Sequence, residues 1–435
     1  MVTRLLTGNA AAAWGARLAC VDYVPAFPIT PQTEIIETLA AWFADGTLSG
    51  KFVTLDGEHS MVTAAGAAAA TGVRVFTATS SQGLLYAMEA LYTIAGWRVP
   101  LVVVNVSRGL SSPITLGPDH NDVLAARDSG MIQLHAETCQ EVLDSVLMAF
   151  RLAEDPRIHV PVLINLDGFY LSFTREPVSI PDRAAAARFL PPFVPSRNAF
   201  RGSRPVAHGV AVLDGPTYSY FRYQSHRAVT NALEVHGEVA AEFEQEFGRC
   251  YGAVEPFAMD DADFVLVMAG SFATKGKAAV QRWRNNGVRA GLLRLRMIRP
   301  RPTRDLVNAL SGCRAVGVID QNLSPGLGGI LFQEVAAALA DAAGPSGQWR
   351  RSPALRSFVD GLGGKDISAA EFDHVLDVLR KAKPDVANVE PELLLTSREW
   401  RDVRNRLATA GTWPVEVDHA DQQGTLQEPE ATPGA

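Results

Sequence analysis

The chain has 435 residues, of which 47% are hydrophobic and 20% charged, so it is long enough to form two or three domains with separate cores. Its formal net charge of -7 offers no basic field to nucleic acid, and no basic amphipathic face for anionic lipid stands out. The four cysteines are widely spaced, residues 1–13 lack the pattern of a signal peptide, and the longest apolar run, 99–106, is too short to cross a bilayer. We therefore expect a cytoplasmic protein with no iron-sulfur cluster, disulfide framework or membrane span of its own.

Residues 1–178 alternate short β-branched runs with Ala-rich helical stretches. This pattern predicts an α/β domain in which a doubly wound parallel sheet is covered by helices on both faces. Strands are predicted at 73–77, 101–106 and 160–165, and helices at 34–43, 60–71, 83–96 and 139–154. Active sites of such sheets collect at the carboxyl ends of the strands, so polar residues there are the first candidates.

The rest of the chain is predicted to contain a connecting segment, a second α/β domain and an extension. Residues 179–259 are rich in Pro, Arg, Tyr and Phe and contain one predicted helix, at about 228–248. The second domain spans 260–385, with strands at 264–268, 290–295 and 315–320 and a helix at 276–285. The extension, 386–435, becomes polar and is predicted to be disordered from about residue 408.

The first candidate segment lies at residues 27–34. Pro28 and Pro31 bracket Thr30 directly before a predicted helix. Because proline favours the first helical position, the pattern predicts Thr30 as the N-cap, with its hydroxyl at the positive end of the helix. Either an ordinary cap or a ligand-binding hydroxyl fits this pattern.

Glu58 follows an acidic turn between a strand and an Ala-rich helix. A carboxylate that opens a helix is commonly a surface residue that interacts favourably with the helix dipole. A buried carboxylate with a raised pKa could instead share a proton with a ring nitrogen, as the aminopyrimidine of thiamine requires.

Two further loops follow predicted strands. Small hydroxyl residues and a glycine at 77–83 either form a tight strand-to-helix turn or let a planar ligand approach the backbone, and their spacing fits neither a P-loop nor G-x-G-x-x-G. Arg108 ends the strand at 101–106 and is followed by glycine. An arginine there can bind a substrate carboxylate through two hydrogen bonds or form a structural salt bridge.

Together these segments resemble the α subunit of pyruvate:ferredoxin oxidoreductases, a family of 2-oxoacid:acceptor oxidoreductases. The resemblance covers almost the whole folded chain and rests on segments in the family's order, at 8–16, 28–35, 58–60, 77–84, 119–122, 126–130, 242–243, 248–249, 268–271, 291–296, 320–326 and 361–366. It implies a thiamine-diphosphate pyrimidine-binding type of domain followed by a domain like the C-terminal domain of transketolase.

The same resemblance implies roles for individual residues. Glu58 would bond the pyrimidine ring of thiamine diphosphate, and Thr30 and Arg108 would hold the substrate carboxylate. The other cofactor contacts would come from Pro28, Ser80, Ser81 and Gln82. The implied reaction is oxidative decarboxylation of pyruvate to acetyl-CoA and CO2, with coenzyme A as co-substrate and ferredoxin as electron acceptor.

The cofactor is expected to be shared between subunits. Related enzymes hold the diphosphate and Mg2+ with a Gly-Asp-Gly sequence followed by an Asn pair, and this chain has no such segment. A partner β subunit would therefore carry the diphosphate-binding domain and Mg2+, and no metal ligand is expected on this chain. Partner subunits, including γ and a ferredoxin-like δ, would carry the [4Fe-4S] clusters.

Three alternatives stay open at this point. The substrate could be another 2-oxoacid, either branched-chain, aryl, 2-oxoglutarate or oxalate, because the segments 116–118 and 191–221 depart from the expected pattern. The chain could be a non-catalytic assembly subunit, although the joint presence of Thr30, Glu58 and Arg108 argues against it. An independent nucleotide-binding Rossmann protein would need a Gly-rich loop after the first strand, and none is found.

Overall fold

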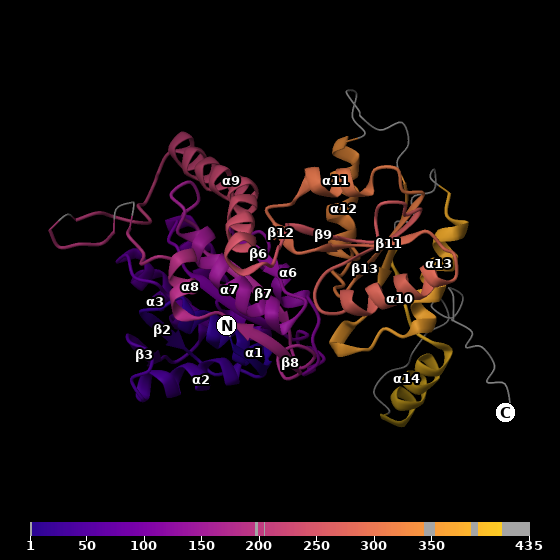
Figure 1. Cartoon of the computed structure of the whole chain (residues 1–435), viewed down its shortest axis with the longest axis horizontal. Coiled ribbons are helices and arrows are strands. Elements are labelled where there is room, and N and C mark those ends of the chain that lie inside the picture. The colour runs from indigo at the N-terminus through magenta and orange to yellow at the C-terminus, as the bar shows by residue number, and fades with distance from the viewer. Residues whose placement is uncertain (1, 196–198, 204, 343–352, 384–389, 411–435) are drawn as a thin grey trace. The chain divides into compact units, whose positions relative to one another are not determined.

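A computed structural model of the chain describes residues 2–195, 199–203, 205–342, 353–383 and 390–410. The chain divides into two compact units (Figure 1). The first contains Met1–Glu255, Ala269–Ala273 and Arg294–Asp305, and the second contains Pro256–Met268, Thr274–Leu293 and Leu306–Ala435. No helix in the described ranges is long and apolar enough to cross a membrane.

The first unit is built on a parallel sheet. Its strands follow the order β12-β6-β7-β5-β4. The strands β6, β7, β5 and β4 are parallel, and β12 runs antiparallel to β6. A pair of parallel strands, β2 and β3, continues beside β4 through a bridge between Tyr23 and Val75. Every residue of β4, β5, β6 and β7 is buried, which requires cover on both faces, so the predicted doubly wound arrangement is confirmed. The strands of this unit are β1 (Val2–Thr7), β2 (Tyr23–Ala26), β3 (Lys51–Thr54), β4 (Phe76–Thr79), β5 (Val102–Ser107), β6 (Ile132–His135), β7 (Val162–Asp167), β8 (Arg175–Ile180) and β12 (Met297–Arg299).

The helices of the first unit pack on this sheet and on one another, except for the first half of the last helix. They are α1 (Gly8–Leu18), α2 (Thr33–Ala44), α3 (Glu58–Ala70), α4 (Ser81–Tyr86), α5 (Met88–Trp97), α6 (Asn121–Ala125), α7 (Cys139–Ala153), α8 (Arg183–Phe189) and α9 (Gly215–Phe247). Small residues let α1 approach α7, because a Cβ on Gly15 would lie 2.6 Å from the Cβ of Val146. The alanines of α1 complete this part of the core, as Ala12 and Ala16 are fully buried.

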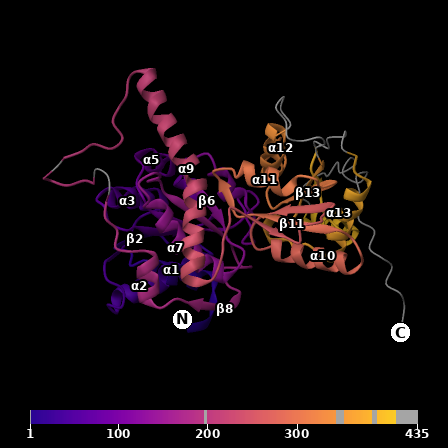
Figure 2. The same cartoon turned by 45° about the horizontal axis from the view of Figure 1, so that its top comes forward.

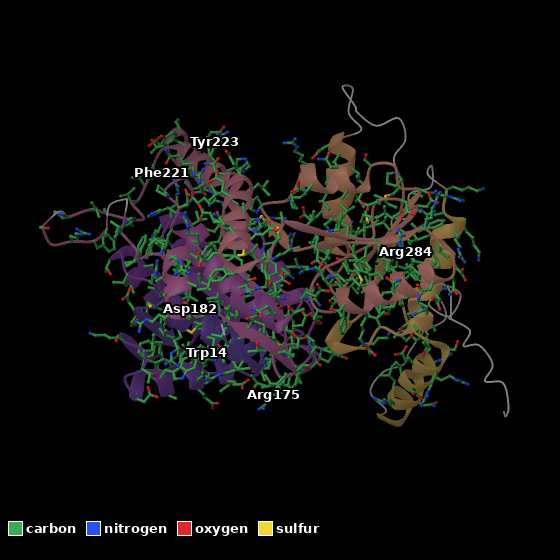
Figure 3. All side chains as sticks on the ribbon, in the orientation of Figure 1. Trp14, Arg175, Asp182, Phe221, Tyr223 and Arg284 are labelled. Atoms are coloured by element: carbon green, nitrogen blue, oxygen red, sulfur yellow. The ribbon has the colours of Figure 1, made fainter. Side chains whose placement is uncertain are left out.

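The predicted helix of the connecting segment begins 13 residues earlier than expected, since α9 starts at Gly215 and the prediction started at about 228. Its N-terminus is capped by the Asp214 side chain, which accepts a hydrogen bond from the Thr217 amide at 2.8 Å. The first half of α9 extends away from the sheet (Figure 2) and leaves Phe221 and Tyr223 exposed (Figure 3). Because this half has no face buried against the sheet, its sequence lacks the repeat of apolar residues every three to four positions from which a helix is predicted.

The second unit contains a sheet with strand order β15-β14-β13-β10-β11-β9, in which β10, β13, β14 and β15 are parallel. Its elements are β9 (Val254–Phe257), β10 (Phe264–Met268), α10 (Ala273–Asn285), β11 (Ala290–Leu295), α11 (Thr303–Leu310), β13 (Ala315–Asp320), α12 (Ile330–Ala342), β14 (Ala354–Val359), the 3-10 turn Leu362–Gly364, α13 (Ala369–Lys381), β15 (Glu392–Leu393) and α14 (Ser397–Ala410). The three predicted strands coincide with β10, β11 and β13. Of the tail predicted to be disordered from about residue 408, the helix α14 includes the part up to Ala410, and 411–435 lie outside the described residues.

Candidate active site

Most of the predicted site residues gather at the carboxyl ends of the parallel strands of the first unit. The loop after β2 carries Thr30, the turn after β3 carries Glu58, and Arg108 follows β5 directly. Ser80 lies between β4 and α4, and Ser81 is the first residue of α4. Because parallel strands end on one edge of a sheet, loops that are distant in sequence meet there.

Glu58 is the first residue of α3 and is buried, with 6% of its surface exposed. Its carboxylate lies against the backbone of Gly83, because a Cβ at residue 83 would stand 2.3 Å from Glu58 Oε1 and 2.7 Å from Thr79 Oγ1. Only glycine leaves room for the carboxylate at this point of α4. The surface-carboxylate interpretation of Glu58 is therefore wrong.

Two buried hydroxyl groups at the end of β4 have no hydrogen-bond partner among the described residues. They are Thr79 Oγ1, at the end of β4, and Ser80 Oγ, which follows it. Buried polar groups in proteins are nearly always hydrogen-bonded. Two buried hydroxyl groups without a partner therefore mark a place where a ligand or water supplies the missing hydrogen bonds. A polar ring with both donors and acceptors fits this set of carboxylate and hydroxyl groups.

Arg108 is buried, with 8% exposure, and its partners are neutral. Nη1 donates to the carbonyl of Thr30 at 2.7 Å and Nη2 to the side-chain oxygen of Gln82 at 2.6 Å, while Nε has no partner. Within the described ranges, no carboxylate forms a salt bridge with this guanidinium, and burial lowers its pKa although the charge of Asp122 opposes the shift. The arrangement therefore suits binding of an anion.

The structure corrects the predicted role of Thr30 in the helix. Gln32 occupies the N-cap position of α2 and makes no side-chain capping bond, because its amide group donates back to the carbonyl of Phe27 at 2.8 Å. Thr30 is exposed, and its carbonyl accepts a hydrogen bond from Arg108. The carbonyl of its loop neighbour Pro31 accepts instead from Asn9 Nδ2 at 2.8 Å. Pro28 is also exposed in this loop.

Asp122, in α6, connects the loops after β4 and β5 and was not among the predicted site residues. One of its oxygens accepts from the amides of Ser81 at 3.0 Å and Arg108 at 3.3 Å and from Asn105 Nδ2 at 3.0 Å. Burial raises the pKa of Asp122 to about 6, although the hydrogen bonds oppose the shift. Ser81 itself has a φ of 48°, a left-handed conformation that is costly for a residue with a side chain.

A second buried charge pair lies beside this network. His120 Nε2 is 2.8 Å from Asp167 Oδ1, and Ser271 donates to the other oxygen of Asp167 from its amide and its hydroxyl at 2.7 and 2.6 Å. Burial alone would raise the pKa of Asp167, but the charge of His120 and these hydrogen bonds lower it to about 2. Burial holds the pKa of the neighbouring His135 well below its ordinary value. The sequence gives no local pattern for these contacts, because they join residues far apart in the chain.

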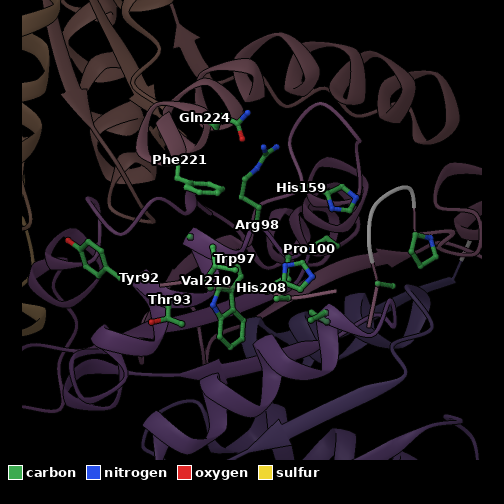
Figure 4. Close-up of a pocket in the computed structure, with 18 of the residues that line it drawn as sticks. Tyr92, Thr93, Trp97, Arg98, Pro100, His159, His208, Val210, Phe221 and Gln224 are labelled. Carbon is green, nitrogen blue, oxygen red and sulfur yellow. The ribbon is translucent and has the colours of Figure 1, made fainter. Parts of the chain in front are cut away.

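A cavity in the first unit is lined by none of the predicted site residues. This cavity of about 720 Å³ is bounded by Trp97, Pro100, His208 and Phe221, among others (Figure 4). Pro100 precedes β5, so the cavity lies toward the amino ends of the strands, away from the loops described above. The described residues also contain no cluster of three or more His, Cys, Asp or Glu side chains that could hold a metal ion.

Two family models match the chain. Residues 14–241 match the thiamine-diphosphate-binding domain of pyruvate flavodoxin/ferredoxin oxidoreductases, and residues 262–372 match core domain II of pyruvate:ferredoxin oxidoreductases. Together these matches cover most of both units.

Curated relatives extend over most of the chain. Pyruvate synthase subunit PorA of Methanothermobacter thermautotrophicus is 37% identical, covering 88% of this chain and 96% of the relative. PorA of Thermotoga maritima is 39% identical over 88% of this chain and 94% of its own. Ketoisovalerate oxidoreductase subunit VorA of Pyrococcus abyssi is 37% identical, covering 87% of this chain and 94% of the relative.

A solved structure shares the fold. The chain matches 2-oxoglutarate:ferredoxin oxidoreductase from Magnetococcus marinus with a TM-score of 0.67 at 19% identity, covering 87% of this chain and 65% of that chain.

Proposed function

This chain belongs to the pyruvate flavodoxin/ferredoxin oxidoreductase family, and we propose that it acts as the α subunit of a thiamine-diphosphate-dependent pyruvate:ferredoxin oxidoreductase. In the proposed reaction, pyruvate and coenzyme A yield acetyl-CoA and CO2, and the electrons pass to ferredoxin. The observation that carries the proposal is the buried carboxylate of Glu58, held against Gly83 beside the unpartnered hydroxyl group of Thr79.

The residues around Glu58 fit the pyrimidine half of thiamine diphosphate. An aminopyrimidine ring offers both donors and acceptors to a carboxylate and to hydroxyl groups such as those of Thr79 and Ser80. Ser81, Gln82 and Pro28 belong to the same proposed site. When bound, thiamine diphosphate supplies the acidic ring carbon and the electron sink that decarboxylation of a 2-oxoacid needs.

In this mechanism the buried carboxylate of Glu58 would hold the pyrimidine half of the cofactor by a hydrogen bond and would keep the shared proton away from bulk water. Arg108 binds the carboxylate of the 2-oxoacid through its charge and its free Nε. The backbone carbonyl of Thr30 and the side-chain oxygen of Gln82 accept hydrogen bonds from the guanidinium and fix its plane. The exposed Thr30 hydroxyl is available to the same carboxylate.

The proposed site is completed by partner subunits. We infer that a β subunit supplies the diphosphate-binding domain and Mg2+, since this chain lacks the Gly-Asp-Gly segment. The γ and ferredoxin-like δ subunits would carry the [4Fe-4S] clusters that lead to ferredoxin. Several relatives of this chain are likewise named as subunits.

The proposal is tested by replacing Glu58 with Gln in the complex with its partner subunits. Glutamine keeps the shape but cannot take up a proton, so we expect kcat for pyruvate- and coenzyme-A-dependent reduction of viologen to fall by about 100-fold or more. The control is Glu37→Gln, the same change on the exposed side of α2, which should keep full activity. A fully active Glu58→Gln complex would refute the assignment.

The match to a ketoisovalerate oxidoreductase subunit makes the side chain of the substrate a second point to test. The same complex should be assayed with pyruvate and with 2-ketoisovalerate. We expect the higher kcat/KM with pyruvate, and a preference for the branched acid would reassign the substrate but keep the chemistry.

A further inference from the structure

One buried carboxylate connects the two loops that carry the proposed site. Asp122 is fully buried, and its Oδ2 accepts the amide of Ser81 after β4 and the amide of Arg108 after β5. The same oxygen accepts from Asn105 Nδ2, whose amide also donates to Asn165 in β7 at 2.9 Å. The carboxylate thus bonds directly to the ends of two adjacent strands and reaches the next through Asn105.

The other oxygen of this carboxylate is also occupied. Asp122 Oδ1 accepts the amide of Val123 at 2.7 Å, which fixes the side chain to its own helix α6. With Oδ2 bound to both loops, the side chain can neither rotate nor leave without breaking a contact to the site. An uncharged group of the same shape could not satisfy this set, because every one of the four partners is an N–H donor.

We propose that Asp122 is a positioning residue whose carboxylate fixes the Ser81 and Arg108 loops so that the Arg108 guanidinium faces the 2-oxoacid carboxylate. The inference rests on the proposed function for its substrate, but the loop contacts are observed in the chain itself. Asp122 touches no reacting group, and it acts through the backbone of Arg108 and Ser81.

A pH dependence follows from the charges around Asp122. Burial and, to a smaller extent, the neighbouring carboxylate of Asp119 raise its pKa to about 6 against the opposing hydrogen bonds. Arg108 and His120 are the cationic or titratable groups that face it. Below about pH 6 the carboxyl takes up a proton and holds the amide donors less firmly. We therefore expect KM for pyruvate to rise as the pH falls below about 6, with kcat less affected.

The test uses the complete complex with Asp122→Asn, measured for KM, kcat and hydrogen exchange in the peptides that contain Ser81 and Arg108. We expect KM for pyruvate to rise about tenfold or more, exchange of both peptides to accelerate, and the rise in KM at acid pH to disappear. The control is Asp144→Asn, which removes another buried carboxylate, one that bonds Arg249 and Tyr251 away from these loops. It should leave all three measurements unchanged.

Activity of the wild-type complex on pyruvate tests the proposed function separately. Unchanged exchange and unchanged KM in Asp122→Asn would overturn the positioning role and leave the proposed function intact. If this variant does not fold, the dependence of KM on pH in the wild-type complex still tests the inference. A KM for pyruvate that is constant between pH 5 and 8 would contradict the role of Asp122. An acid rise that persists in Asp122→Asn would assign the titration to His120 and overturn the inference as well.

Discussion

At the scale of single residues, Arg108 is a buried cation whose hydrogen-bond partners carry no charge. Burial of a guanidinium costs free energy unless the charge is paired, and here both neighbours are neutral oxygens. A substrate carboxylate would supply the missing counter-charge. In the proposed function, the free-energy cost of burying the guanidinium would be offset when the substrate binds.

Arg108→Ala is expected to weaken binding of the 2-oxoacid. Charge-assisted hydrogen bonds contribute about 1.5–3 kcal/mol, so KM for pyruvate should rise by roughly 10- to 100-fold. Steady-state kinetics of the complex measure this effect, and Arg175→Ala, an exposed arginine of β8 (Figure 3), serves as the control. An unchanged KM in Arg108→Ala would assign the carboxylate to another group.

Gly83 is predicted to be essential because of Glu58. In Gly83→Ala the new methyl group would overlap the Glu58 carboxylate, so the carboxylate must move and kcat should fall about tenfold or more. Gly96→Ala makes the same change in α5 where nothing lies within 4 Å, and it should keep its activity. If both variants were equally active in the complex, the close fit between Gly83 and Glu58 would have no catalytic importance.

At the scale of elements, the sequence predicted buried strands better than contacts between loops. Strands such as β10 and β13 were predicted with correct bounds, since continuous apolar runs are typical of parallel strands covered on both faces. The first half of α9 was missed because it has no buried face. The capping role assigned to Thr30 was wrong because Gln32 and the loop carbonyls form other hydrogen bonds.

The candidate site was predicted only in part. The resemblance pointed to Glu58 and Arg108, which the fold brings to one edge of the sheet. Asp122 was noticed only as part of a motif, because its contacts with Ser81 and Asn105 span 41 and 17 residues and have no local pattern. Only the folded chain reveals which of several polar residues in a loop connects the others.

The contact between α1 and α7 makes a prediction for stability. Gly15→Ala would place a methyl group 2.6 Å from Val146 Cβ and force the two helices apart, at a cost of about 1–3 kcal/mol in the free energy of unfolding. Gly237→Ala in α9, where nothing lies within 4 Å, should instead stabilise by about 0.5–1 kcal/mol through helix propensity. Denaturant unfolding of the two variants measures both effects, and equal shifts would contradict the close packing.

At the scale of the whole molecule, we propose that the chain supplies one half of a shared active site. It offers a carboxylate, unpartnered hydroxyl groups and a buried arginine at one sheet edge, but it has no sequence motif for the diphosphate and its metal. A subunit of this kind is expected to work only in a complex with partners that complete the cofactor site. Its catalytic competence is thus a property of the assembly.

The most direct measurement is a structure of the complete complex with thiamine diphosphate bound. We predict that a carboxylate oxygen of Glu58 lies within hydrogen-bonding distance, about 2.5–3.0 Å, of a pyrimidine ring nitrogen, with the diphosphate held by the partner subunit. A complex in which Glu58 faces solvent, or in which the pyrimidine binds elsewhere, would contradict the account.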